Sequence, residues 1–378
     1  MKQSIASTFI AILLCLTFTF FESCKSPIEP KKETGSDTTS HNFSWQMWEF
    51  GDLYGTGYTS MFFDVAIVNE NDIWAVGDIK LKDSTGKTDA RWINAMHWNG
   101  IEWKPFMLQF YDYPGLPSTF SYPANSVCVL DSGKIIISHA NQVTFIKDEK
   151  QIRTEYIPAP AFRIWANSSN NIYVAGIKGG IAHYDGKAWR EIESGTTLNL
   201  LDIYSRDGKN VYAAGGEMLG YKGVVLKGDE TGFKVIAEGK PSVRKDELFN
   251  PYFIGMAALL WVSPSDTVYF GGSLLYGYKD GKIDYVKTLA GNKTGMNGTG
   301  DYWGYLTEMR GNGDNDIVLV GGGNTIRHYN GKNWKQLGMP YNYNSEYIWS
   351  SVDMKKNTIA AVGRSNTNGI IMILKRGI

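Results

Sequence analysis

The sequence predicts an all-β fold built from repeated four-stranded units, and three observations support this. The chain of 378 residues contains 42 glycines and is 13% aromatic, a composition expected of short strands and tight turns. The phrase DIWAVG at 72–77 returns as NIYVAG at 171–176 and as DIVLVG at 316–321. Each copy is followed by HWNG, HYDG or HYNG and then by a tryptophan. A unit that recurs in this way indicates an array of similar supersecondary structures.

The first unit divides into four strands. We expect them at 61–68, 72–77, 94–98 and 101–108. The dipeptide Asn99-Gly100 between the last two is the strongest short hairpin signal, because both residues tolerate positive φ. Four antiparallel strands of this kind form one blade of a β-propeller.

Six further copies align on their second strand, at 135–137, 172–174, 211–213, 268–270, 318–320 and 359–361. The last copy ends after its third strand, 370–374, whereas 43–50 near the N-terminus resembles an orphan fourth strand. We therefore expect the N-terminal strand to complete the C-terminal blade, which removes an exposed sheet edge. The predicted fold is a seven-bladed β-propeller over residues 44–378, or six or eight blades if the weak second copy is misread.

Glycine follows most of the second strands, where we expect tight packing near the ring axis to favour small residues. The outer strands carry a large aromatic residue that we expect to fill the space between neighbouring blades. These residues are Trp103, Trp189, Phe233, Tyr285 and Trp334.

The phrase DIWAVG with HWNG and the following tryptophan resembles bacterial propeller repeats of the BNR and Ycf48-like kind. It is also similar to the propellers that form sensor domains of some two-component regulators. The resemblance covers nearly all of residues 44–378 and implies a fold rather than an activity. The sialidase branch carries a Ser-x-Asp-x-Gly-x-x-Trp box, but Ser205–Gly208 lacks the tryptophan.

The first 43 residues are expected to lie outside the propeller. Lys2 precedes an apolar run at 5–21, which is too short for a spanning helix and suits a secretory signal. The run ends in FESC, which resembles a bacterial lipoprotein signal, although Glu22 departs from the usual residue. The resemblance implies a signal peptide at 1–23, a lipidated Cys24, and a flexible linker at 24–43. The alternative is an ordinary cleaved signal with an incidental cysteine.

Composition argues against several kinds of site. The 38 basic and 38 acidic residues balance, so no basic footprint points to nucleic acid. Of three cysteines only Cys128 lies in the predicted propeller, where we expect a buried, small apolar residue and no disulfide framework. His97, His183 and His328 share one repeat position, where we expect bonds to a turn or neighbouring strand; His41 and His139 are expected to be isolated. No metal or cofactor is expected.

The turns after the first and third strands of each blade are short, whereas the other connections are long and lie on the opposite face. Loops on a rigid scaffold often carry binding residues. The candidate ligand-binding residues are aromatic residues of the long connections: Tyr111, Tyr113, Tyr122, Phe249, Tyr252, Tyr302, Trp303, Tyr341, Tyr343 and Tyr347. The alternative is that these rings only pack the connections onto the propeller.

The sequence thus predicts a non-catalytic, monomeric lipoprotein of the bacterial cell envelope, held in the outer membrane, on either side, by its N-terminal lipid. Its loop-rich face is expected to bind a protein or a glycan. The alternative is a glycan-active hydrolase or lyase that uses carboxylates on the same face. Candidate carboxylates are Asp246, Glu247, Asp301, Glu308 and Glu346, but no catalytic residue is assigned.

Overall fold

The computed structural model describes residues 38–51, 59–81, 93–113, 116–117, 122–130, 133–217, 222–241, 252–285, 305–339 and 346–377. They belong to one compact unit, Thr38–Ile378. The predicted signal peptide, Cys24 and most of the predicted linker lie outside the described residues. Among the helices of the described part, none is long and apolar enough to cross a membrane.

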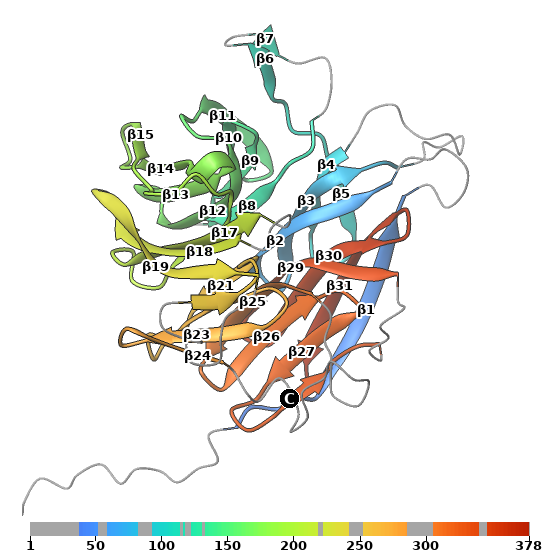
Figure 1. The fold of residues 1–378 in the computed structure, drawn as a ribbon. Helices are drawn as coiled ribbons and strands as arrows, with labels where there is room; N and C mark the ends of the chain where they lie inside the picture. The colour runs from blue at the N-terminus through green and yellow to red at the C-terminus, as the bar shows by residue number, and fades with distance from the viewer. Residues whose placement is uncertain are drawn as a thin grey trace, which may run out of the picture. The chain divides into compact units, whose positions relative to one another are not determined.

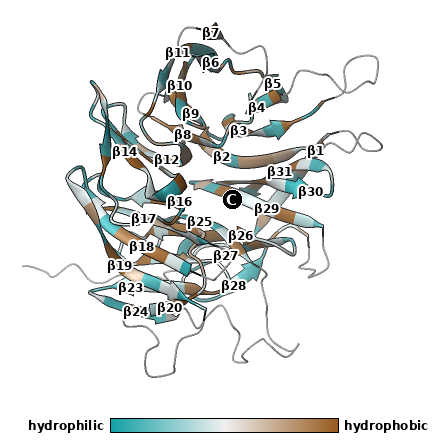
Figure 2. Cartoon of the chain, turned by 45° about the horizontal axis from the view of Figure 1, so that its top comes forward, coloured by the Kyte–Doolittle hydropathy of each residue, from teal (hydrophilic) through white to brown (hydrophobic). Residues whose placement is uncertain are grey.

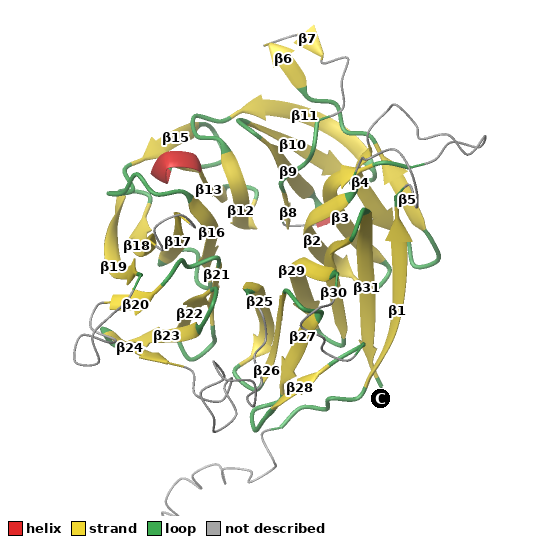
Figure 3. Ribbon diagram, turned by 45° about the vertical axis from the view of Figure 1, so that its right-hand side comes forward, coloured by secondary structure: helices red, strands yellow, loops and turns green. Residues whose placement is uncertain are grey.

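Seven antiparallel sheets stand around a central axis as the blades of a propeller (Figures 1 and 3), which confirms the predicted fold class. Blade 1 contains β2 (Met61–Asn69), β3 (Asp72–Ile79), β4 (Ile93–Trp98) and β5 (Trp103–Phe106). Blade 2 contains β8 (Ser126–Val129), β9 (Ile135–His139), β10 (Gln142–Lys147) and β11 (Lys150–Tyr156). Blade 3 contains β12 (Ala161–Ser168), β13 (Asn171–Gly176), β14 (Ile181–Tyr184) and β15 (Trp189–Ile192). Blade 4 contains β16 (Leu200–Ser205), β17 (Val211–Glu217), β18 (Lys222–Asp229) and β19 (Gly232–Lys240). Blade 5 contains β21 (Leu259–Val262), β22 (Val268–Gly271), β23 (Leu275–Lys279) and β24 (Lys282–Tyr285). Blade 6 contains β25 (Leu306–Gly313), β26 (Asp316–Gly321), β27 (Thr325–Tyr329) and β28 (Trp334–Gln336).

Blade 7 is built from both ends of the propeller. It contains β29 (Tyr347–Lys355), β30 (Thr358–Ser365) and β31 (Asn368–Arg376), and its outermost strand is β1 (Phe43–Phe50). The register runs from Phe43 opposite Arg376 to Phe50 opposite Gly369. The predicted closure by the N-terminal strand is therefore confirmed.

Two of the long connections form strands that the sequence did not reveal. Between blades 1 and 2, β6 (Tyr111–Tyr113) and β7 (Leu116–Pro117) form a small hairpin. After blade 4, β20 (Tyr252–Ile254) pairs in parallel with β19 and adds a fifth strand. A short 3₁₀ turn, η2 (Ile177–Gly179), follows β13.

The hydrophobic core lies between neighbouring blades, and apolar residues follow the strands rather than the turns (Figure 2). Trp103 packs in a cluster shared by blades 1 and 7, and Trp189 in one shared by blades 2 and 3. Phe233 and Trp334 occupy the corresponding places between blades 3 and 4 and between blades 5 and 6. The predicted role of these aromatic residues is confirmed; the side chain of Tyr285 lies outside the described residues.

The two faces of the propeller differ in their connections. Turns between the first and second and between the third and fourth strands of a blade are short, as at Asn69–Asp72 and Trp98–Trp103. We call this side the short-turn face and the other the loop-rich face. Residues 38–42 reach β1 on the short-turn face, where the Thr39 amide donates to the Asn330 carbonyl.

Candidate functional site

The repeated glycine makes room for a bulge in the innermost strand. In blade 1, Phe62 pairs with Gly77 and Asp64 with Val76, so the innermost strand has one extra residue. A Cβ added to Gly77 would lie 2.1 Å from the Met61 carbonyl oxygen, a separation that real Cβ atoms do not reach. The glycine therefore belongs to the bulge, and bulges characteristically re-aim the side chain that follows.

The same register shift recurs in blades 3, 4, 6 and 7, where it precedes Arg163, Asp202, Glu308 and Ser351. The bulges thus aim one polar side chain from each of five blades into the central channel. Blade 2 places Ser126 and blade 5 places Leu260 at the corresponding register positions without a bulge.

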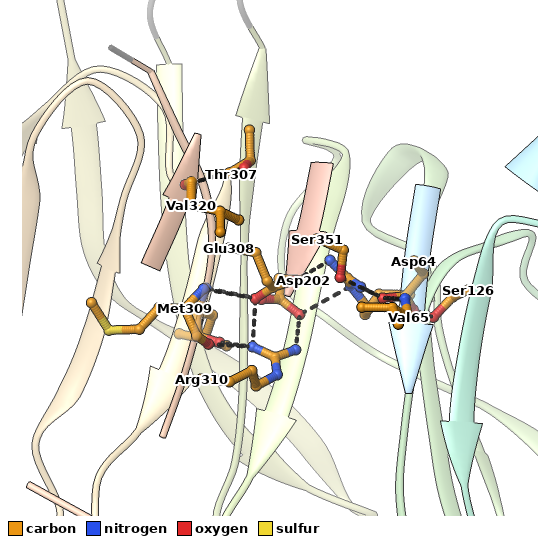
Figure 4. Close-up of polar contacts among 12 residues, drawn as sticks. Asp64, Val65, Ser126, Asp202, Thr307, Glu308, Met309, Arg310, Val320 and Ser351 are labelled. Atoms are coloured by element: carbon orange, nitrogen blue, oxygen red, sulfur yellow. Dashed lines mark hydrogen bonds and ion pairs between the residues drawn. The ribbon is translucent and has the colours of Figure 1, made fainter. Parts of the chain in front are cut away.

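Arg163 of blade 3 reaches carboxylates from three other blades across the channel. Its Nη1 lies 2.6 Å from Oδ1 of Asp64, its Nη2 contacts Glu308, and its Nε lies 3.4 Å from Asp202. The side chains of Asp202 and Glu308 are fully buried, and that of Asp64 is 5% exposed. A second arginine, Arg310, contacts Glu308 and lies 3.8 Å from Asp202 (Figure 4).

Hydrogen bonds saturate the buried carboxylates. Asp64 accepts hydrogen bonds from the hydroxyls of Ser126 (2.6 Å) and Ser351 (2.7 Å) and from the Val127 amide (3.0 Å), as Figure 4 shows in part. Asp202 accepts from the amides of Ile203 and Leu260, both at 2.9 Å. Several of these donors belong to neighbouring blades, so each carboxylate ties two or three innermost strands together.

Burial and charge act in opposite directions on these groups. Burial alone would raise the pKa of Asp64, but Arg163 and the two serine hydroxyls hold that pKa below its usual range. Burial raises the pKa of Glu308 to about 8, although Arg163 and Arg310 oppose the change. Burial also raises the pKa of Asp353 on β29.

A cavity of about 290 Å³ lies beside this network, between the innermost strands. The lining comes from the C-terminal halves of those strands, so the cavity lies toward the short-turn face. Its walls include Cys128, Arg163, Tyr204, Trp261, Arg310 and Asp353.

Cys128 and Glu308 differ from expectation. Cys128 is half-buried rather than fully buried: it packs against the apolar cluster between blades 2 and 3 and also lines the cavity. Desolvation within the channel raises the pKa of its thiol to about 12, so it is protonated at neutral pH. Glu308, expected among the carboxylates of the loop-rich face, is fully buried in the channel because the bulge of β25 turns it inward.

Of the five carboxylates named for the glycosidase alternative, the structure describes Glu346 and Glu308. Glu346 is exposed immediately before β29 and accepts a hydrogen bond from Asn366. Asp246, Glu247 and Asp301 lie outside the described residues. Glu308 already contacts two arginines and cannot approach a substrate on the loop-rich face without breaking the network.

The repeated histidines have a structural role, as predicted. Their Nε2 atoms lie 2.8–2.9 Å from the side chain that begins the second strand, namely Asp72, Asn171 and Asp316 for His97, His183 and His328. His41, which the sequence suggested was isolated, instead places its Nδ1 2.8 Å from Nδ1 of His328. This contact arises because residues 38–42 cross blade 6 before they enter β1. No cluster of three potential metal ligands occurs among the described residues.

The aromatic candidates of the loop-rich face are only partly described. Tyr111, Tyr122, Tyr252 and Tyr347 are partly exposed. The backbone of Tyr113 is described in β6, but its side chain is not. Phe249, Tyr302, Trp303, Tyr341 and Tyr343 lie outside the described residues.

The four described tyrosines do not form one cluster. Tyr122 stacks on His139, with ring centroids 4.7 Å apart, and its hydroxyl donates to Asp112 beside Tyr111. Tyr111 and Tyr122 both belong to the connection between blades 1 and 2, and the stacking on Tyr122 shows that His139 is not isolated. Tyr252 lies on β20 of blade 4 under the Lys240 amine, 3.1 Å from the ring centroid, and Tyr347 begins blade 7.

A signal for the channel network was present in the sequence. Asp64, Arg163 and Glu308 each lie eight residues before the first residue of the repeat phrase, at Asp72, Asn171 and Asp316. A charged residue inside an apolar first strand, always eight residues before the repeat phrase, marks the position whose side chain enters the channel. Its residue type changes from blade to blade, so neither composition nor motif searches reveal that the charges meet.

Comparison with known proteins supports the fold. A solved structure of Ycf48 bound to a D1 peptide is similar, with a TM-score of 0.58 and 13% identity over 90% of this chain and 99% of that chain. The extracellular domain of BT4673 from B. thetaiotaomicron gives a TM-score of 0.56 and 12% identity over 87% of this chain and 40% of that chain. The WD40 propeller of Doa1 gives a TM-score of 0.55 and 13% identity over 88% of this chain and 98% of that chain.

No protein-family profile and no curated protein sequence matches this chain. At identities this low the structural neighbours establish the fold alone. The resemblance to Ycf48-like and two-component-regulator propellers that the repeat phrase suggested is confirmed at that level.

Proposed function

We propose that this protein is a non-catalytic binding scaffold whose loop-rich face recognises a protein partner. The proposal is carried by the unequal faces of the propeller. The described turns between paired strands are short on one face, whereas the strands that flank the long connections end on the other, where Tyr111, Tyr122, Tyr252 and Tyr347 are partly exposed. Partly exposed aromatic side chains are typical of protein-binding surfaces. The Ycf48 structure with a bound peptide offers a precedent in the same fold.

We further propose that the protein is a lipoprotein of the bacterial envelope, held by a lipid on Cys24. The described chain reaches the propeller through Thr39 and His41 on the short-turn face. An anchor that joins there leaves the loop-rich face accessible. Replacement Cys24→Ser should move the protein from the membrane pellet to the soluble envelope fraction; a protein that stays in the pellet contradicts this part of the proposal.

The binding role is tested by capture from bacterial envelope extract with two matched double variants. Asp112→Lys with Glu346→Lys changes exposed acidic residues of the loop-rich face. Glu70→Lys with Glu102→Lys makes the same charge change on the short-turn face. We expect a specific partner to be lost only with the first pair.

Retention of the same partner by both double variants, or its loss only with the short-turn pair, contradicts the assignment of the binding face. A glycan array probed with the same proteins tests the glycan alternative. Binding to a glycan that the first pair abolishes, without any captured protein, would replace the protein partner by a carbohydrate.

A further inference from the structure

The channel network holds four carboxylates, Asp64, Asp202, Glu308 and Asp353, beside the guanidinium groups of Arg163 and Arg310. Lys355 also lines the cavity. When Glu308 holds a proton, the three remaining carboxylates and these three cations balance in number, so the carboxylates differ only in which of them contacts a cation.

Asp353 is the carboxylate of the cavity wall that has backbone amides as its hydrogen-bond donors. Its two carboxylate oxygens accept the amides of Ile67 (2.7 Å) and Met354 (2.8 Å). Within the described residues it forms no ion pair, because Arg310 is engaged by Glu308 and Asp202. Lys355 at the rim donates instead to the Val68 carbonyl at 2.9 Å. Asp353 therefore presents a carboxylate without a contacting cation to the cavity.

The remaining walls suit a cation with an apolar stem. Tyr204 and Trp261 line the cavity, and aromatic faces attract cations. The volume of about 290 Å³ is just below the roughly 300–1,000 Å³ of small-molecule pockets, so it fits one side chain or a small amine. A multivalent metal ion would need several free oxygen ligands, whereas the oxygens of Asp64 are already occupied by Arg163, Ser126 and Ser351.

We propose that this axial cavity is a binding site for an alkylammonium group, either a small primary amine or a lysine side chain, with Asp353 as its counter-ion and Tyr204 and Trp261 as its apolar walls. This site opens toward the short-turn face and does not depend on the binding role proposed for the loop-rich face.

The test is a calorimetric titration of the intact protein with butylammonium and, separately, with butanoate, which has the same chain length and the opposite charge. Butylammonium should bind saturably and butanoate should not. Replacement Asp353→Asn should weaken butylammonium binding at least about tenfold, roughly 1.4 kcal/mol. Asp266→Asn, an exposed aspartate outside the cavity, is the matched control and should leave the affinity unchanged.

A second variant guards against misfolding of Asp353→Asn, since that carboxylate also accepts two amides. Ala166→Leu fills the cavity from β12 and keeps every charge, so it should abolish binding while the circular dichroism spectrum stays that of the parent. Because burial raises the pKa of Asp353, affinity should also increase as the pH rises through that pKa and the carboxylate loses its proton.

Three results would overturn the proposal: no saturable binding of butylammonium, equal affinity in Asp353→Asn and the control, or butanoate binding as tight as butylammonium. The last result would assign the cavity to the two arginines instead. Lysine blocked at both ends distinguishes the source of the ligand. Its binding points to a protein side chain, whereas binding of butylammonium alone points to a free amine.

Discussion

Replacement of Arg163 by leucine should destabilise the propeller strongly, because it leaves Asp64, Asp202 and Glu308 buried without their shared cation. Removing one partner of a buried ion pair typically costs about 3–5 kcal/mol. The folding unit, Thr38–Ile378, has about 340 residues, and an unfolding entropy of ~2.1 cal/mol/K per residue gives ~0.7 kcal/mol/K. The melting temperature should therefore fall by about 4–7 °C.

The loss should depend on pH, and its sign follows from proton linkage. Without Arg163, burial is no longer opposed by its guanidinium, so the folded-state pKa values of Asp64 and Glu308 should lie above their unfolded values of about 4. The folded variant then binds more protons than the unfolded chain, so its stability falls as pH rises above about 4. The deficit relative to the parent should be smallest near pH 4 and should grow toward pH 8.

Scanning calorimetry at several pH values, repeated at two scan rates, measures this effect. Arg206→Leu is the control, because its ion pair with Asp266 is exposed and should be worth at most about 1 kcal/mol. An Arg163→Leu variant that melts no lower than this control, or whose deficit does not change with pH, would refute the role given to the network.

Three further outcomes follow from the same geometry. Glu308→Gln should flatten the pH dependence of stability between about pH 4.3, the ordinary glutamate pKa, and about pH 8, the raised pKa of Glu308 in the folded parent. An unchanged calorimetric profile across this range would contradict the prediction. Gly321→Ala should lower the melting temperature by the equivalent of about 1–3 kcal/mol, because its Cβ would lie 2.3 Å from a carbonyl oxygen, whereas Gly322→Ala, with 3.8 Å of clearance, should not. Trp48→Ala should cost about 2 kcal/mol in a denaturation assay, because the Trp48 ring lies 5.2 Å from a tryptophan ring of the neighbouring blade. Trp45→Ala, on the same strand but 46% exposed, should cost under about 0.5 kcal/mol. Equal losses of stability within the glycine pair or within the tryptophan pair would contradict the prediction for that pair.

Most of the fold could be predicted from the repeat phrase. Its strand spacing, its Asn-Gly turns and the orphan strand Phe43–Phe50 were enough to predict seven blades and their closure, because each signal is local or repeated. The glycine at the end of the second strand was also recognised, but its reason was not. Its close neighbour is the carbonyl of a residue such as Met61, which only the paired register reveals.

The channel network could not be read in the same way. Arg163 and Glu308 are separated by 145 residues and meet only because blades 3 and 6 face each other across the axis. The short strands β6 and β20 were missed because they lie in connections without the repeat's periodicity. His41 was misjudged for a similar reason, since its contact with His328 depends on the path of the N-terminal segment across blade 6.

The most direct test of the binding role is photo-crosslinking in intact cells. A photoreactive amino acid would be placed singly at Asp112 or Glu346 on the loop-rich face, and at Asn71 or Lys187 on the short-turn face, all of which are exposed. A scaffold that binds through its elaborated face should give a discrete crosslinked protein from the first two positions and none from the last two. Crosslinks of equal yield from both faces, or from Asn71 and Lys187 alone, would contradict it.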